Sequence, residues 1–171
     1  QFYFDQLPEP KQLRYTFNTD HSQAQDLGSI VPATVAWLSE VLDDARPPQF
    51  SWTLEPNGAI RVQAADEPER VRLWHATNPD ARDFRLETLG PAWTSMELTQ
   101  TASGEYVGYR APPPQGWTAF GVELSFAGST LIPTPLESDQ IYTTPVRVTP
   151  SDLPFRDADG PCGRYAPPVW A

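Results

Sequence analysis

The stretch FSWTLEPNGAIRV, residues 50–62, determines the fold class of most of this chain. Large apolar residues alternate with other residues before and after a central Glu-Pro-Asn-Gly segment, residues 55–58. A period of two is typical of a β-strand with one buried face. Because two such runs flank a segment of turn residues, the stretch predicts an antiparallel β-hairpin.

Similar short runs follow toward the C-terminus, separated by turn residues. We expect further strands at residues 70–76, 84–88, 105–110, 117–126 and 142–149. Roughly seven short strands in about 100 residues are typical of an immunoglobulin-like antiparallel β-sandwich. The predicted fold class is therefore mainly β, with this sandwich over residues 47–150. Residues 151–171 are rich in Pro, have no clear period and form a predicted tail.

The sequence before the hairpin has a different organisation. Alternation over residues 11–17 predicts a strand, and the polar residues 18–22 predict a loop. A helix is then expected from Ser29, which is a suitable N-cap. Its predicted apolar face consists of Val31, Val35, Leu38 and Leu42. Acidic residues and two prolines at 43–48 end the helix, so we place a domain boundary there and treat residues 1–46 as one unit.

The charge and hydropathy of the chain exclude two classes of partner. Lys and Arg number 12 against 22 Asp and Glu, which gives a formal net charge of −10. A surface this acidic repels phosphate backbones, and no basic stripe compensates for it, so we expect no binding to nucleic acid. No apolar run approaches the roughly 20 residues that a membrane-spanning helix needs.

The two histidines of the chain differ in their surroundings. His75 lies within an expected strand, where a structural role is the better interpretation. His21 lies in the polar loop between an expected strand and an expected helix. In α/β-hydrolases the catalytic His occupies such a loop, and the chain order is Ser, then Asp or Glu, then His. An exposed loop His without catalytic function fits the same pattern, so both interpretations stay open.

The other members of a catalytic triad have no counterpart in this sequence. It contains no Gly-x-Ser-x-Gly nucleophile elbow. Asp20 is adjacent to His21, which is poor geometry for a carboxylate that orients the ring, and Asp26 is a candidate without further support. If His21 is a general base, its partners lie upstream of Gln1. The chain alone is then expected to be inactive in acyl transfer.

No motif predicts a metal or a cofactor. A His-Glu-x-x-His motif and paired cysteines are absent, and the single Cys162 has no partner for a disulfide within the chain. The string DADG, residues 157–160, lacks the remaining ligand positions of a calcium loop, so a solvated turn is preferred. Four tryptophans are candidates for core packing or, less favoured, for sugar stacking: Trp52, Trp74, Trp93 and Trp117.

Several strings, in order along the chain, resemble a known family. They are QFYFDQLP (residues 1–8), LRY (13–15) followed by NTDHS (18–22), PQFSW (48–52), RLW (72–74) with ATNP (76–79), ARDFR (81–85), and GWTAF (116–120) with VEL (122–124). Over about residues 1–155 the chain is similar to the PhoPQ-activated pathogenicity-related protein family, which also includes eukaryotic autocrine proliferation repressors. The family name describes regulation rather than a reaction, and it gives no substrate.

The resemblance implies a secreted or periplasmic α/β-hydrolase that carries a C-terminal β-sandwich. Residues 1–46 then correspond to the last strand, the His loop and the last helix of the hydrolase domain. His21 matches the family's His in its Thr-Asp-His-Ser segment, and it is the one catalytic position that carries over. The nucleophilic Ser and the acidic Asp are expected before Gln1.

The start of the chain leads to a related expectation. The sole methionine is Met96, and Gln1 is followed by an apolar cluster at residues 2–4, so we expect the C-terminal portion of a longer protein. A mature terminus formed by processing is the alternative. Residues 1–46 alone leave a strand edge and an apolar helix face uncovered. We therefore expect them to contact the missing N-terminal hydrolase portion, the sandwich or another copy of the chain.

Three functions follow as hypotheses. The first is a serine hydrolase that cleaves an ester or peptide bond, with His21 as its general base. The second is a binding or signalling protein on a hydrolase scaffold whose catalytic residues are idle. The third, for this chain alone, is a sandwich module that binds carbohydrate or protein, with Trp74 and Trp93 as its candidate contacts.

Overall fold

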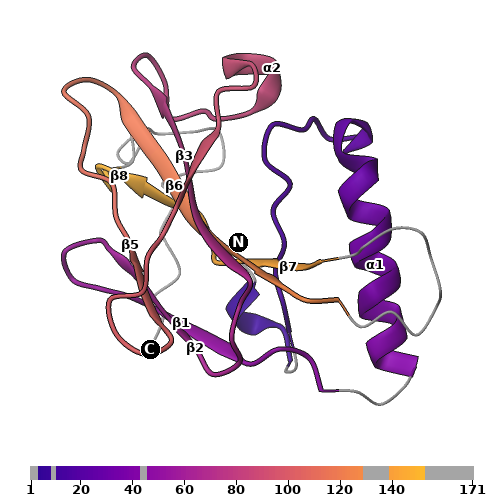
Figure 1. Ribbon diagram of the computed structural model, residues 1–171. Helices are drawn as coiled ribbons and strands as arrows, with labels where there is room; N and C mark the ends of the chain where they lie inside the picture. Colours follow the sequence, from indigo (N-terminus) through magenta and orange to yellow (C-terminus); the bar gives the residue numbers. More distant parts are fainter. Residues whose placement is uncertain (1–3, 9–10, 43–45, 129–138, 153–171) are drawn as a thin grey trace.

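The computed structural model describes residues 4–8, 11–42, 46–128 and 139–152, and over these residues the fold is mainly β (Figure 1). A three-stranded antiparallel sheet has the order β1 (Phe50–Leu54), β2 (Ile60–Ala64), β5 (Glu105–Gly108). A five-stranded antiparallel sheet has the order β4 (Thr94–Glu97), β3 (Arg70–Asn78), β6 (Trp117–Phe126), β7 (Gln140–Thr143), with β8 (Arg147–Thr149) also paired to β6. The prediction of a β-sandwich is confirmed.

The β1–β2 hairpin has the pairing that the alternation predicts. Trp52 lies opposite Val62, and Phe50 lies opposite Ala64. The Gly58 N–H donates to the Glu55 carbonyl at 2.8 Å and closes the turn. Gly58 has a φ of 88°, a left-handed conformation that glycine adopts without steric cost.

The hydrophobic core lies between the two sheets. Alternate residues of β6, namely Phe120, Val122 and Leu124, are at most 1% exposed and form its centre. Ile60 and Val62 of β2 complete it from the three-stranded sheet. Such complete burial of apolar side chains is the main source of stability in a domain of this size.

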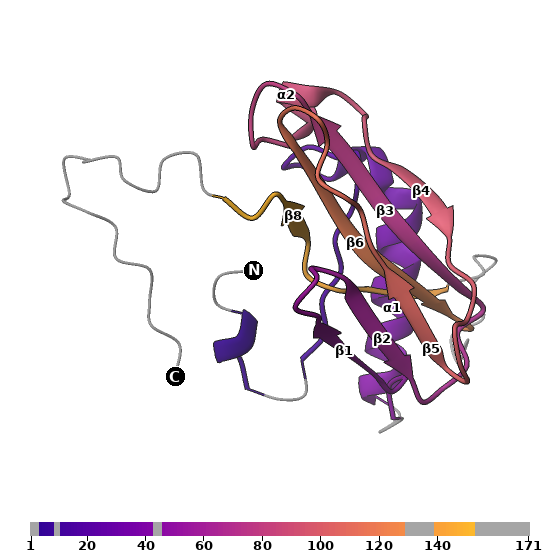
Figure 2. The same ribbon diagram turned by 90° about the vertical axis from the view of Figure 1, so that its left-hand side faces the viewer.

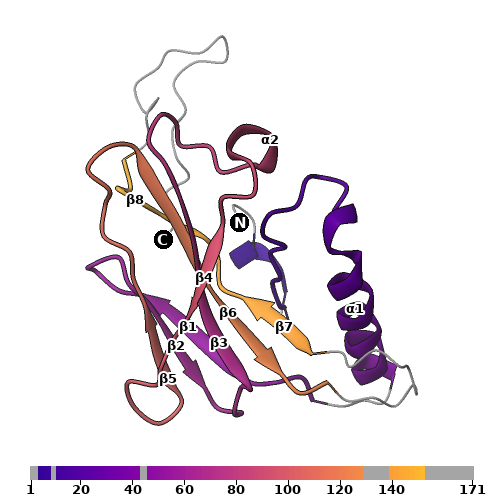
Figure 3. The ribbon, with the colours of Figure 1, turned by 45° about the horizontal axis from the view of Figure 1, so that its top comes forward.

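The N-terminal part of the chain forms a third layer on the other face of the five-stranded sheet (Figure 2). This layer consists of the helix α1 (Leu27–Leu42) and the extended residues 11–16. Two one-turn 3₁₀ helices, η1 (Phe4–Gln6) and η2 (Ala24–Asp26), precede α1. Figures 1 and 3 show α1 beside β7, with which it is in contact.

The expectation of a strand at residues 11–17 is wrong. These residues run beside β7, and the Thr143 N–H donates to the Leu13 carbonyl at 2.8 Å, but they form no regular ladder with it. The Tyr15 N–H donates to the Thr143 side-chain hydroxyl instead of a carbonyl. A ladder needs repeated backbone pairs, and the polar side chain of Thr143 takes one of them.

The helix is present, and Val31, Leu38 and Leu42 share one apolar face that is exposed, but Ser29 is not the N-cap. α1 begins at Leu27, and the Ser29 hydroxyl lies inside it, where it accepts from Arg14 and donates to the Asp26 carbonyl. The side chains that α1 buries are small, namely Pro32, Ala36 and Ser39. Because small side chains allow a close approach to the sheet, the large ones face outward. Six of these are at least 44% exposed: Leu27, Val31, Trp37, Leu38, Val41 and Leu42. We call this set the outer face of α1.

Two strand predictions also need correction, and one strand was not predicted. Residues 84–88 form a short helix, α2 (Leu86–Leu89), because the Asp83 carboxylate binds Arg85 and Thr88 and folds the chain into a turn. The expected strand at 142–149 divides into β7 and β8 around Thr144 and Pro145. Strand β4 was not expected, since all four of its residues are exposed and have no alternation.

Candidate functional site at the His21 loop

His21 lies in the turn between the extended residues 11–16 and α1, as the sequence predicted. Its side chain is exposed, and the structure records no hydrogen bond or ion pair for it within the described residues. The loop around it, residues 17–23, contains two residues with positive φ, Asn18 and Gln23. An exposed imidazole on a fixed turn is available to a group that approaches from outside these residues.

The neighbouring carboxylate of Asp20 is engaged with the loop itself. It accepts hydrogen bonds from the Ser22 backbone N–H at 2.8 Å and from the Gln25 amide at 2.9 Å. Hydrogen bonds from the Ser22 side chain first, and then from Gln25, hold the pKa of Asp20 below its usual range. Asp20 therefore acts as a brace for the loop.

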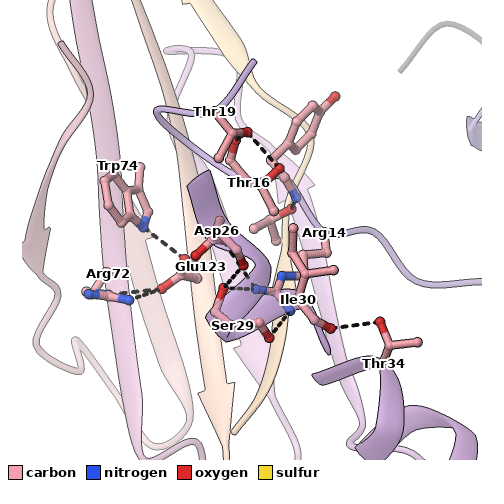
Figure 4. Close-up of polar contacts among 12 residues, drawn as sticks. Arg14, Thr16, Thr19, Asp26, Ser29, Ile30, Thr34, Arg72, Trp74 and Glu123 are labelled. Carbon is pink, nitrogen blue, oxygen red and sulfur yellow. Dashed lines mark hydrogen bonds and ion pairs between the residues drawn. The ribbon is translucent and has the colours of Figure 1, made fainter. Parts of the chain in front are cut away.

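The second candidate acid, Asp26, pairs with Arg14 at 3.7 Å (Figure 4). Arg14 also donates to the Ser29 hydroxyl at 2.7 Å and to the Ser29 carbonyl at 3.2 Å. Burial is the main cause that lowers the pKa of Arg14, and Asp26 and Glu123 oppose that shift. The first turn of α1 is thus attached to the extended residues 11–16, and neither candidate acid orients His21 in the described part of the chain.

A tie to the sandwich holds the other end of the loop. The Asn18 side-chain amide donates to the Trp93 carbonyl at 2.8 Å and accepts from the Trp93 N–H at 2.9 Å. The Thr19 hydroxyl donates to the Thr16 carbonyl at 2.8 Å. No local pattern predicts the Asn18–Trp93 pair, because its two residues are 75 positions apart.

A charge network around the buried Glu123 lies near the loop, on the face of the five-stranded sheet that carries the N-terminal layer (Figure 4). Glu123, which is 6% exposed, accepts from the Arg72 guanidinium at 2.9 Å and from the Trp74 indole N–H at 3.0 Å. The ring of Phe17 lies on Trp74, with 4.9 Å between the ring centroids. This network forms a rigid floor for the chain that leads to His21.

A cavity of about 300 Å³ lies between these elements. The loop, the start of α1 and strands β3 and β6 contribute to its lining. Its two arginines, Arg14 and Arg72, are paired with Asp26 and Glu123. Because these charges are neutralised within the site, the cavity is suited to support the loop rather than to attract a charged ligand.

The part of the chain that contains the His21 loop matches a known protein family. Residues 1–85, about half of the chain, match the family model of the PhoPQ-activated pathogenicity-related protein. Over residues 1–85 the chain belongs to this family. The matched segment contains the His21 loop, α1, the β1–β2 hairpin and β3. No curated protein and no solved structure matches the chain.

The PhoPQ-related segment also contains His75, the second histidine. It lies half-buried in β3, where burial first, and then the charge of Arg110, lowers its pKa. The rings of Trp74 and Trp93 pack against Phe17, with Phe17–Trp93 centroids 4.7 Å apart. One face of each tryptophan is therefore covered, which favours packing over sugar stacking.

The search for metal and membrane features concerns the described residues alone. Among them, no group of three or more His, Cys, Asp or Glu residues is arranged to hold a metal ion. No helix among them is long and apolar enough to span a bilayer. The DADG string at 157–160 and Cys162 lie outside the described residues.

Proposed function

We propose that this chain is the C-terminal part of a secreted or periplasmic serine-hydrolase-like protein in which His21 is the general base. The observation that carries the proposal is the exposed position of His21 on a loop that is braced at both ends directly before α1. The location outside the cytoplasm rests on the family resemblance. The bond to be cleaved is an ester or a peptide bond.

In this mechanism His21 takes the proton of a nucleophilic serine and later transfers it to the leaving group. We propose that the serine and the acid precede Gln1, and the order Ser, Asp, His along hydrolase chains supports this proposal. We assign residues 1–46 to the hydrolase-like domain, 47–150 to the sandwich and 151–171 to a tail.

The exposed apolar residues on the outer face of α1 support the proposal that residues 1–46 bind a partner. It gathers six large apolar side chains that remain at least 44% exposed. Contiguous exposed apolar surface on this scale marks an interaction site. We propose the hydrolase-like portion as its occupant rather than a second copy. With a net charge of −10, two copies of the chain repel one another.

The test of the catalytic proposal is labelling of the longer protein with a fluorophosphonate probe. We expect wild type to be labelled, and His21→Ala to reduce the labelling rate by about a thousandfold or more, because the serine loses its base. The matched control is His75→Ala, which removes the other histidine of the chain and should leave labelling in place. The 171-residue chain alone should not react.

Two results would contradict this proposal. Absence of labelling in well-folded longer protein would favour a binding or signalling protein on a hydrolase scaffold. Equal labelling of wild type and His21→Ala would show that another group serves as the base.

The test of the outer face is Leu38→Glu, a charge placed on a side chain that is 44% exposed. In the 171-residue chain we expect a change in unfolding free energy within about 0.5 kcal/mol. In the longer protein we expect a loss of at least about 2 kcal/mol, because the charge is then buried at the contact. Denaturant titrations of both proteins give these values.

The control for Leu38→Glu is Met96→Glu, which alters an equally exposed apolar residue on β4. It should have the same small effect in both proteins. Sedimentation of the 171-residue chain tests the alternative that a second copy of the chain covers the outer face of α1. A dimer that Leu38→Glu dissociates would replace the hydrolase-like portion by a second copy.

A further inference from the structure

Asn18 is the residue that joins the His21 loop to the sandwich by hydrogen bonds. Its one side chain satisfies both backbone groups of Trp93, at 2.8 and 2.9 Å. Asn18 has a φ of 58°, a left-handed conformation that Asn tolerates better than most residues. The chain turns at this point, and His21 follows three residues later.

The anchor at Trp93 is itself fixed. Its indole N–H donates to the Phe84 carbonyl at 3.1 Å, and its ring packs on Phe17. The next residue, Thr94, begins β4 and pairs with His75 of β3. The hydrogen bonds between Asn18 and Trp93 therefore attach the His21 loop next to the first residue of β4 in the five-stranded sheet.

The remaining polar ties of the loop are local. Thr19 bonds to Thr16, and Asp20 bonds to Ser22 and Gln25, all within six positions of one another. Such contacts fix the shape of the loop but not its place on the sheet. The Phe17 ring holds the start of the loop against Trp74 and Trp93, and Asn18 adds the directional hydrogen bonds to a distant segment.

We propose that Asn18 is a positioning residue for His21, through which the β-sandwich sets the place of the catalytic loop. This inference rests on the proposed role of His21 as general base. It gives the sandwich a function in catalysis without contact between sandwich and substrate. A displacement of about 1 Å in a catalytic group can reduce a rate on the order of a hundredfold. The hydrogen bonds between Asn18 and Trp93 can therefore affect the reaction rate strongly.

Two substitutions separate the hydrogen bonds from the backbone. Asn18→Gly tolerates the left-handed φ and removes both bonds to Trp93. Asn18→Asp retains the acceptor for the Trp93 N–H but places a carboxylate oxygen against the Trp93 carbonyl. The matched control is Asn78→Gly. Asn78 is 4% exposed and also bonds to backbone, at Asp83 and Asp80, but none of these bonds joins the His21 loop.

The first measurement is NMR on the 171-residue chain, and it does not depend on catalysis. In Asn18→Gly we expect amide exchange over residues 19–23 to accelerate on the order of tenfold, with increased mobility of the His21 ring. Asn18→Asp should show the same change, and Asn78→Gly should show none at His21. Unchanged exchange and ring mobility in Asn18→Gly would overturn the inference.

The second measurement is the fluorophosphonate labelling rate of the longer protein as a function of pH. We expect Asn18→Gly to lower the rate on the order of ten- to a hundredfold, with the midpoint of the pH profile unchanged, because Asn18 does not contact the His21 ring. Asn78→Gly should label at the wild-type rate. Wild-type labelling of Asn18→Gly would overturn the inference. If the longer protein is not labelled at all, the proposed function fails, and the NMR result alone decides whether Asn18 places the loop.

Discussion

Replacement of Glu123 by Ala is expected to lower the free energy of unfolding by about 3 kcal/mol. The Glu123 carboxylate is buried, and it accepts from both the Arg72 guanidinium and the Trp74 indole N–H. Its removal leaves a positive charge and a polar N–H without their acceptor on a covered sheet face. Breaking a buried pair on one side typically costs about 3–5 kcal/mol, and we expect the lower end because Arg72 is 25% exposed.

Denaturant titration of the 171-residue chain measures this change. The matched control is Glu105→Ala, which breaks the ion pair with Arg61 on the three-stranded sheet. That arginine is 37% exposed, so the loss should stay below about 1 kcal/mol. The double replacement of Arg72 and Glu123 by Leu should recover most of the loss, because no charge is then left unpaired. Equal effects of Glu123→Ala and Glu105→Ala would show that the network contributes no more than a surface pair.

Phe120→Ala is expected to have a larger effect, a loss of about 3–5 kcal/mol. Phe120 is 1% exposed and lies at the centre of β6, where both sheets contribute to the core. Its truncation removes buried apolar area and leaves a cavity that the surrounding strands fill only in part. For a chain of this length the melting temperature should fall by on the order of 10 °C.

The comparison for Phe120→Ala is Leu42→Ala in α1, whose side chain is 79% exposed. In the 171-residue chain this second truncation should change the melting temperature little, since it removes almost no buried area. Calorimetry of both variants provides the measurement. A loss at Leu42 comparable to that at Phe120 would show that the outer face of α1 is already covered in the isolated chain.

Local patterns predicted those elements in which large apolar residues alternate with other residues along the sequence. The β1–β2 hairpin and the ten residues of β6 lie where the alternation placed them. Strand β4 had no such pattern because none of its side chains is buried. At residues 84–88 the polar side chain of Asp83 outweighed the alternation and produced α2.

The candidate site was predictable only in part, for a related reason. The loop position of His21 followed from the order of elements in the sequence. The hydrogen bonds that hold the loop and the preceding segment could not be predicted, because Asn18–Trp93 and Tyr15–Thr143 join residues 75 and 128 positions apart. The apolar face of α1 followed from the spacing of its residues, and Val31, Leu38 and Leu42 lie exposed on the outer face. The helix instead buries Pro32, Ala36 and Ser39, whose small size gives no hydrophobic signal.

The long separations within the third layer also impose an order on synthesis. Tyr15 leaves the ribosome 128 residues before Thr143, to which its backbone N–H is bound in the folded chain. At about 5–20 residues per second, this interval is on the order of ten seconds. During this time the five-stranded sheet beside which the helix and the His21 loop lie is incomplete. The contacts of these segments with the sandwich can form only after the sandwich has folded.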